Sequence, residues 1–248
     1  MLIYETTKQP GLSMALQSLP GNFSLDRSRN ATAQVFEHLR DLIVTIALEP
    51  GTVLARQQLA DYFKLSTTPI RDALLRLEEE RLVDIYPQHL TRVSAIDLTS
   101  ARQAHVLRLS VELEMAHQLS QQRPASLDGA LTDLITRQRQ ALERQDLESF
   151  ARIDLEFHRT MYAAADISEL WSLVRRLSGN LDRLRRLHLP LNSKAKRILD
   201  DHSAIAHAIA AGQSDQARAA VRLHLSGTLS EIDALREKYP DFVLPPPA

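Results

Sequence analysis

The hydrophobic residues of this chain repeat with the period of an α-helix almost from end to end, and that pattern changes only once. Between about residues 32 and 81, apolar positions recur every three or four residues in three short runs. Residues 82–86 and 91–94 read instead as two short strands joined by a turn. The helical period then returns and continues to about residue 237. This order predicts three helices, a two-stranded wing and a long helical region.

The pattern predicts a mainly α protein in two parts. Residues 31–95 are expected to form a winged helix-turn-helix with three helices and a two-stranded wing, whose third helix begins at Thr68-Pro69, with Thr68 as the N-cap. Residues 96–238 are expected to form an antiparallel all-helical bundle of six or seven helices. The expected spans are 98–121, 126–144, 147–165, 168–188, 192–211 and 214–237, with a flexible arm at 1–30 and a tail at 239–248.

Composition excludes several classes of protein. There are 0 Cys residues, so disulfides and thiolate metal sites are excluded. No apolar run approaches the roughly 18 residues of a membrane helix, and the N-terminus lacks a signal pattern, so we expect a cytoplasmic protein. Residues 1–95 carry 10 Lys+Arg against 11 Asp+Glu. Affinity for nucleic acid would therefore have to come from locally placed Arg.

Several short segments between residues 48 and 83 keep a characteristic order and spacing. They are Leu48-Glu49-Pro50-Gly51, Leu59-Ala60, Ser66-Thr67-Thr68-Pro69-Ile70-Arg71-Asp72-Ala73-Leu74, Leu77-Glu78 and Leu82-Val83. Together they resemble the GntR family of regulators over about residues 32–94. The resemblance implies an N-terminal domain that binds double-stranded DNA.

The chain departs from the usual GntR pattern at three positions. Thr67 stands where the family usually has Arg, and Arg81 and Leu90 stand where it usually has Gly. We expect the missing Arg to alter the sequence preference or to weaken phosphate contact. We expect Leu90 to give a differently shaped wing.

The third helix is the expected reading element for DNA. Arg71 lies one turn into it, opposite the buried stripe, where it can reach guanine O6 and N7. The hydroxyls and N–H groups at its tip can meet a phosphate. The alternative is that Arg71 only pairs with a neighbouring acid such as Asp72 or Glu78. The expected DNA-contacting residues are Arg56, Gln57, Ser66, Thr67, Thr68, Arg71 and, at the wing tip, His89.

Four polar residues lie on helix faces that should point into the bundle. Asp154 and His158 are four residues apart on one helix face, and His202 and His224 lie on the apolar faces of two later helices. A single buried His is common, whereas three His and an Asp aimed inward need a shared partner. A divalent cation supplies one.

This arrangement resembles the FCD domain, which follows the winged helix in the FadR branch of the GntR family. The resemblance covers about residues 97–235 and implies metal binding by Asp154, His158, His202 and His224. Three imidazoles and one carboxylate suit Zn, Ni, Mn or Fe, and Zn or Ni is the expected ion. The other histidines are expected to be ordinary surface or packing residues.

The combined pattern predicts a DNA-binding repressor, not an enzyme. We expect a homodimer that binds a short inverted repeat and responds to a small carboxylate effector at the metal. Arg108 and Glu112 match an R-x-x-x-E motif of the family, so Arg108 either pairs with the effector or only with Glu112. Asn180 is a further effector-binding candidate. The alternatives are a metal sensor and a metal-dependent hydrolase, although His-Glu-x-x-His is absent from the sequence.

Overall fold

The computed structural model describes residues 23–86, 90–191 and 193–243. The chain divides into two compact units between residues 95 and 96, and each unit is described by itself. The predicted mainly α class is confirmed, because helices form both units and the only sheet among the described residues has two strands. Within the described ranges, no helix combines the length and the apolar character needed to cross a membrane.

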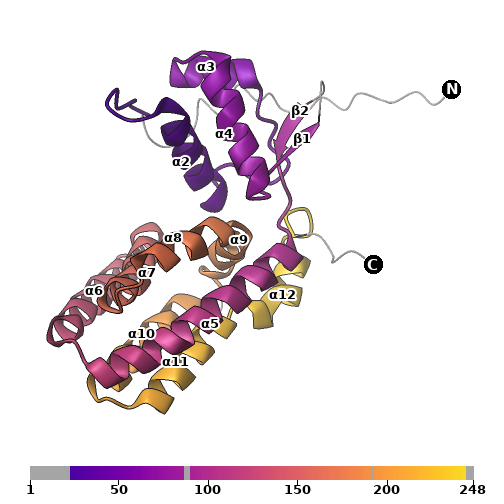
Figure 1. Cartoon of the computed structure of the whole chain (residues 1–248). Coiled ribbons are helices and arrows are strands. Elements are labelled where there is room, and N and C mark those ends of the chain that lie inside the picture. Colours follow the sequence, from indigo (N-terminus) through magenta and orange to yellow (C-terminus); the bar gives the residue numbers. More distant parts are fainter. Residues whose placement is uncertain (1–22, 87–89, 192, 244–248) are drawn as a thin grey trace. The chain divides into compact units, whose positions relative to one another are not determined.

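The N-terminal unit is a winged helix-turn-helix (Figure 1). Three helices bury their apolar stripes together, with Leu39, Ile70 and Leu74 each 0% exposed. The two strands pair antiparallel, with Val83 opposite Val93. The elements are α2 (Ala31–Val44), α3 (Arg56–Phe63), α4 (Thr67–Glu79), β1 (Val83–Tyr86) and β2 (Leu90–Val93).

Helix α4 begins earlier than the sequence pattern predicts. Its N-cap is Ser66, so the expectation that Thr68 caps the helix was wrong, and Pro69 occupies the third helical position. Proline is tolerated there because the first N–H groups of a helix have no partner within the helix. No side chain caps α4. The N–H groups of Thr67 and Thr68 therefore face outward at an exposed tip.

Residues 23–30 are more firmly attached than the expected flexible arm. The Phe23 ring packs edge-on against Phe63 at 4.7 Å between centroids. The Asn30 side chain accepts a hydrogen bond from the N–H of Ala33 and so caps α2. The rest of the arm, residues 1–22, lies outside the described residues.

The C-terminal unit is a helical bundle (Figure 1). Helix α5 packs along α11, α6 packs along α7, and α10 lies against both α6 and α11. Its core includes the fully buried Phe150, Phe157 and Tyr162. The elements are α5 (Leu98–Gln122), α6 (Ala125–Glu143), α7 (Leu147–Ala164), α8 (Ser168–Leu177), α9 (Gly179–His188), α10 (Lys194–Ala210), α11 (Ser214–Ser226), the 3₁₀ turn η1 (Leu229–Glu231) and α12 (Ile232–Lys238).

Two helices predicted as single spans are each divided. The span 168–188 breaks at Ser178, whose hydroxyl bonds back to the Val174 carbonyl at 2.7 Å. The span 214–237 breaks after α11, at Gly227. A Cβ at Gly227 would lie 2.6 Å from Nζ of Lys194, the first residue of α10.

The segment after α12 is part of the unit and not only a tail. The N–H of Ile96 donates to the Phe242 carbonyl at 2.8 Å, and Ile96 forms a parallel bridge with Val243. Residues 244–248, including the predicted Pro-rich end, lie outside the described residues.

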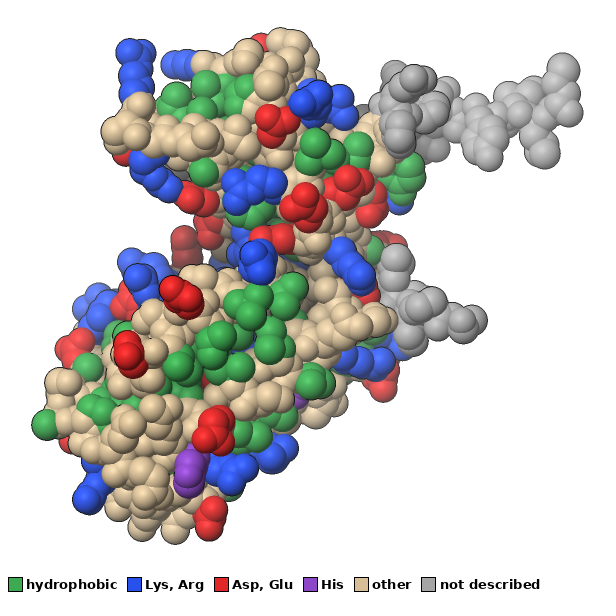
Figure 2. Space-filling view, viewed as in Figure 1, with side chains coloured by type: hydrophobic (Ala, Val, Ile, Leu, Met, Phe, Trp, Pro, Cys, Tyr) green, Lys and Arg blue, Asp and Glu red, His purple; other side chains and the backbone are tan. Residues whose placement is uncertain are grey.

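Large hydrophobic side chains also lie on the surface of the C-terminal unit. Figure 2 shows hydrophobic side chains gathered on one face of it. The most exposed are Val106 at 61%, Leu177 at 48% and Leu223 at 69%.

Five helices end in the same hydrogen-bonded turn. A residue just beyond each helix has a positive φ and donates to the carbonyl three residues back. The next N–H reaches the carbonyl five residues before it, which is the Schellman motif. Only one of these five residues is a glycine, although glycine adopts this conformation most easily. They are Lys64, Arg81, Gln145, Asp166 and Gly212, which follow α3, α4, α6, α7 and α10.

We expect Gln145→Gly to stabilise the protein. Gln145 has a φ of 58° and an exposed side chain, so glycine removes backbone strain without removing packing. The gain should be about 1 kcal/mol, which raises the thermal midpoint by roughly 2–4 °C. Gln140→Gly is the matched control, because Gln140 is exposed within α6 and glycine there should destabilise by about 1 kcal/mol. Calorimetry that gave both changes the same sign would contradict this account.

Candidate functional site

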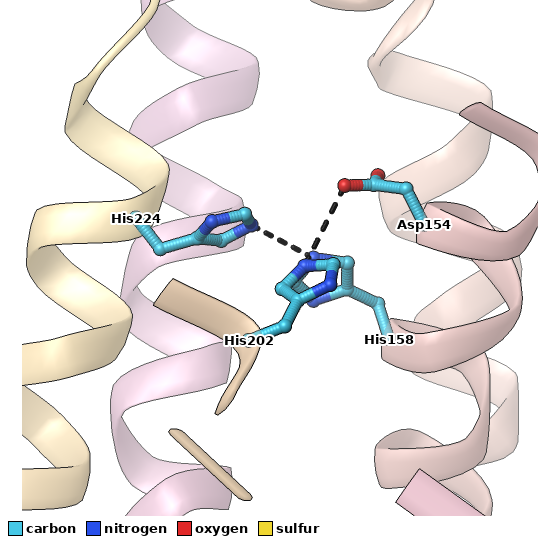
Figure 3. Close-up of side chains that lie close together, drawn as sticks. All are labelled: Asp154, His158, His202 and His224. Atoms are coloured by element: carbon cyan, nitrogen blue, oxygen red, sulfur yellow. Dashed lines mark hydrogen bonds and ion pairs between the residues drawn. The ribbon is translucent and has the colours of Figure 1, made fainter. Parts of the chain in front are cut away.

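The structure brings together the four residues singled out as metal ligands. Asp154 and His158 project from α7, His202 from α10 and His224 from α11 (Figure 3). One potential ligand atom from each lies within 4.8 Å of all the others. All four residues are at most 5% exposed. The i, i+4 spacing therefore places Asp154 and His158 on the same buried face of α7, as the sequence indicated.

The inner faces of these side chains meet at close range. Nε2 of His158 lies 3.1 Å from Nε2 of His224, and Nε2 of His202 lies 3.5 Å from Oδ1 of Asp154. Two metal bonds of about 2.0–2.1 Å at octahedral or tetrahedral angles set ligand atoms roughly 2.9–3.4 Å apart. The observed spacings suit ligands around one ion.

The outer nitrogen of each imidazole faces a polar side chain. Nδ1 of His202 hydrogen-bonds Oε1 of Gln138 at 2.8 Å. Nδ1 of His158 lies 2.8 Å from Oε2 of Glu112, without an aligned hydrogen bond. Nδ1 of His224 lies 3.5 Å from a carboxylate oxygen of Asp201. An acceptor at Nδ1 favours the tautomer that leaves Nε2 free to bind a metal.

Arg185 holds the carboxylate of Asp154 from outside the cluster. Its Nη2 donates to Oδ2 at 2.6 Å, which leaves Oδ1 directed at the imidazoles. Burial alone would raise the pKa of Asp154. The positive charge of Arg185, together with the three histidines, nevertheless holds this pKa well below its usual value. The Asp154 carboxylate is thus ionised and offers one oxygen inward.

The three histidines are uncharged near neutral pH. Burial, more than any neighbouring charge, lowers the pKa of His202 and of His224 to about 3 and that of His158 well below its usual value. A neutral imidazole is the form that coordinates metals.

The buried atoms left without partners fit a cation. Among the described residues, Oδ1 of Asp154 and Nε2 of His202 are buried and accept no hydrogen bond. Unsatisfied polar atoms in an apolar bundle are unfavourable by several kcal/mol. A divalent ion between the four side chains would satisfy these atoms together, so the residues present fit a metal.

The three effector-binding candidates lie in different surroundings. Arg108 is 3% exposed and its Nε donates to Oε1 of Glu112 at 2.6 Å, so these two residues form a buried ion pair. Glu112 links that pair to His158. Asn180 lies apart from them, and its Oδ1 accepts from the N–H of Asp97 at the start of α5 and from Arg183. Asn180 thus supports the fold, and it does not line the cavity described next.

A cavity adjoins the cluster at His224. It is small and opens to solvent. Arg108 lines it, as do three cationic or titratable residues that sequence reasoning missed: His105, Arg185 and Lys194. Nothing in the spacing of these residues along the chain indicated a common cavity, because they come from three helices.

The predicted DNA-contacting residues are exposed where the structure describes them. Ser66, Thr67 and Thr68 form the tip of α4, and Arg56 and Gln57 open α3. The Arg71 side chain is 59% exposed and lies 3.2 Å from the Asp72 carboxylate. Such an exposed ion pair is worth little, so it would not prevent Arg71 from contacting DNA. His89 lies outside the described residues.

Charge on the N-terminal unit is mixed. In the view of Figure 2, its Lys and Arg side chains are interspersed with Asp and Glu. This agrees with the near balance of charges counted over residues 1–95. Contact with phosphates would therefore depend on a few Lys and Arg side chains at suitable positions, and not on a uniformly basic surface.

Comparison with known proteins matches both units. The family of bacterial regulatory proteins named gntR matches residues 31–93, and the FCD domain matches residues 103–227. A protein of Streptomyces ambofaciens described as an uncharacterized HTH-type transcriptional regulator in an unstable DNA locus is 31% identical over 213 residues, which are 86% of this chain and 89% of that protein. The HTH-type transcriptional repressor RspR of Escherichia coli is 26% identical over 218 residues, 88% of this chain and 96% of RspR.

A solved structure shows the same fold. E. coli McbR/YncC superposes with a TM-score of 0.70 at 20% identity, and the superposition covers 85% of this chain and 99% of that one.

We expect Glu112→Leu to destabilise the metal-free protein by about 3–5 kcal/mol, because it leaves the Arg108 guanidinium buried without its acid. The double variant Arg108→Met with Glu112→Leu should lose less, because no unpaired charge is then buried. Urea unfolding in the presence of a chelator measures both. Asp133→Leu is a control, since Asp133 pairs with Arg137 on the surface and should cost under about 1 kcal/mol. A double variant less stable than Glu112→Leu would contradict the reasoning.

Proposed function

Because this chain belongs to the GntR family of bacterial regulatory proteins and carries an FCD domain, we propose that it is a repressor of the FadR branch. Its proposed effector is a small organic acid that binds beside a metal held by Asp154, His158, His202 and His224. Membership of this family makes the chain a DNA-binding transcription regulator and not an enzyme. The metal, the effector and the sign of regulation are the proposal.

The convergence of the four buried ligand atoms carries this proposal. Three separate helices supply them, each imidazole has a polar partner at Nδ1, and a cavity opens beside His224. Zn or Ni suits this donor set. When bound, such an ion supplies a positive charge and open coordination positions for an acid.

The protein's own residues define what else the effector meets. Arg185 fixes the ligand carboxylate of Asp154 and also lines the cavity, so it touches both the metal site and the space for the effector. Arg108 lines the same cavity while holding Glu112 against His158. A molecule bound in the cavity would therefore contact Arg108 and Arg185, the side chains that position the metal ligands.

The assembly we propose is a homodimer on a short inverted repeat. Two-fold symmetry in the protein is matched by a palindromic site in DNA. The hydrophobic side chains gathered on one face of the C-terminal unit (Figure 2) support association through that unit, since large apolar patches often mark interfaces. The name of RspR supports repression.

We expect Arg71→Ala to weaken binding to the specific operator by about 1–3 kcal/mol, because Arg71 is the exposed side chain placed to read a guanine. Mobility shift with DNA from upstream of the protein's own gene measures this, at fixed salt. Arg139→Ala removes the same charge from an exposed site on α6 and should leave affinity within about 0.5 kcal/mol. Equal losses in the two variants would show that α4 does not read the bases.

We expect Gln138→Leu to lower metal affinity by about 10- to 100-fold, because it removes the acceptor that orients His202. Competition with a chromophoric chelator measures the affinity, after elemental analysis identifies the ion. Gln140→Leu makes the same substitution at an exposed position two residues along α6 and should leave metal affinity unchanged. Unaltered affinity in Gln138→Leu would mean that His202 is not a ligand.

A metal sensor is the second candidate, because the same four residues would serve it. Mobility shifts with metal-free and metal-loaded protein decide between the two. If DNA affinity follows the metal with no organic acid present, the ion is the signal. If DNA affinity changes with an organic acid at constant metal, the acid is the effector, as proposed.

A further inference from the structure

Lys194 is a buried cation on the wall of the cavity. It lies in the first turn of α10 and is 5% exposed. Within the described ranges, no hydrogen bond or ion pair involves its ammonium group. Lysine is almost never buried without a partner, because its charge loses hydration. An ammonium that reaches a cavity from an otherwise buried side chain is therefore a group that a ligand can contact.

Arg108 brings a second unsatisfied donor to the same cavity. Its Nε is bound by Glu112, but its Nη2 is buried and has no hydrogen-bond partner among the described residues. Arg108 comes from α5 and Lys194 from α10, so the two donors lie on different walls.

The other charges around the cavity are already balanced. Arg108 is paired with Glu112, and Arg185 is paired with Asp154 and lies 3.6 Å from Asp182. Asp201, on the next turns of α10, attracts Lys194 but is not within ion-pair distance of it. The charge of Lys194, and the charge of any divalent ion, thus remain to be offset by a ligand.

The ammonium lies at the end of a neighbouring helix. Its Nζ lies beside Gly227, at the C-terminal end of α11, 2.6 Å from where a Cβ of that residue would be. The partial negative charge at a helix C-terminus favours a cation there. That dipole makes the buried charge tolerable, but it is only about half of an elementary charge and does not neutralise it.

We propose that Lys194 selects effectors with two acidic groups: one group binds at the metal beside His224, and the second pairs with the Lys194 ammonium. This inference rests on the proposed function, because it assumes an effector in the cavity. A monocarboxylate would satisfy the metal and leave Lys194 unpaired. The chemical class is therefore a small organic dianion, with a dicarboxylate as the first choice.

The test compares two acids of equal carbon number and one phosphorylated acid on the full-length, metal-loaded chain by titration calorimetry. Succinate and butyrate differ in their second carboxylate, and phosphoglycolate offers a phosphate in its place. We expect the wild-type chain to bind succinate about 10- to 100-fold more tightly than butyrate, which is the range for a hydrogen bond to a charged group. Lys194→Met keeps the length of the side chain and should abolish that preference without changing butyrate affinity.

Lys196→Met is the matched control, because Lys196 is exposed on the same helix two residues away. It should keep the preference for succinate. Circular dichroism and metal content establish that each variant is folded and loaded. A preference for phosphoglycolate that Lys194→Met removes also supports the proposal and identifies phosphate as the second group.

Three results would overturn the proposal. If Lys194→Met weakens succinate and butyrate equally, Lys194 maintains the shape of the cavity instead. If it leaves succinate affinity unchanged, the second acid does not contact Lys194. Both of these leave the proposed function standing, because an acid still binds at the metal. If no probe binds the wild-type loaded chain, the effector function and this inference fail together.

Discussion

The C-terminal unit is organised around polar groups that its helices bury together. Three imidazoles and the Asp154 carboxylate lie in an apolar bundle, where polar atoms are tolerated only when something satisfies them. From outside, Gln138 hydrogen-bonds the outer nitrogen of His202, and Arg185 holds the outer oxygen of Asp154. Glu112 and Asp201 face the outer nitrogens of His158 and His224 without an aligned hydrogen bond. Among the inner atoms, Oδ1 of Asp154 and Nε2 of His202 have no hydrogen-bond partner in the described residues. The packing of α7, α10 and α11 therefore brings these four side chains together in one small region.

The same buried charges connect that region to the neighbouring cavity. Arg108 holds Glu112 against His158 and lines the cavity, and Arg185 binds Asp154 and lines it as well. Two side chains that contact the buried cluster thus also line the cavity. The first residues of this unit are also hydrogen-bonded to the rest of it. The N–H of Ile96 donates to the Phe242 carbonyl. Asn180, a candidate for effector binding, accepts the N–H of Asp97 at the start of α5 through its Oδ1.

Helical periodicity was sufficient to locate the candidate ligands, because i, i+4 spacing and apolar stripes are local properties of a helix. Asp154 and His158 shared a face for that reason. The same reasoning missed the breaks at Ser178 and Gly227. The Ser178 hydroxyl bonds to a carbonyl of the preceding helical turn, and Gly227 lies beside Lys194 from another helix. The apolar period of the sequence reports neither kind of contact. The start of α4 was misplaced because Ser66 and Thr68 are both residue types that cap helices, and the apolar pattern does not choose between them.

By itself, the sequence determined the mainly α class, the winged helix-turn-helix and the set of inward-facing histidines, since each follows from residues close together in the chain. Tertiary structure alone decided which side chain faces each Nδ1 atom and which cations share a cavity. Those partners come from helices separated by tens of residues, so only the packing of the helices brings them together. Lys194 shows this most clearly. In the sequence it resembles its exposed neighbour Lys196, and only the packing of the helices makes it a buried residue beside a candidate metal centre.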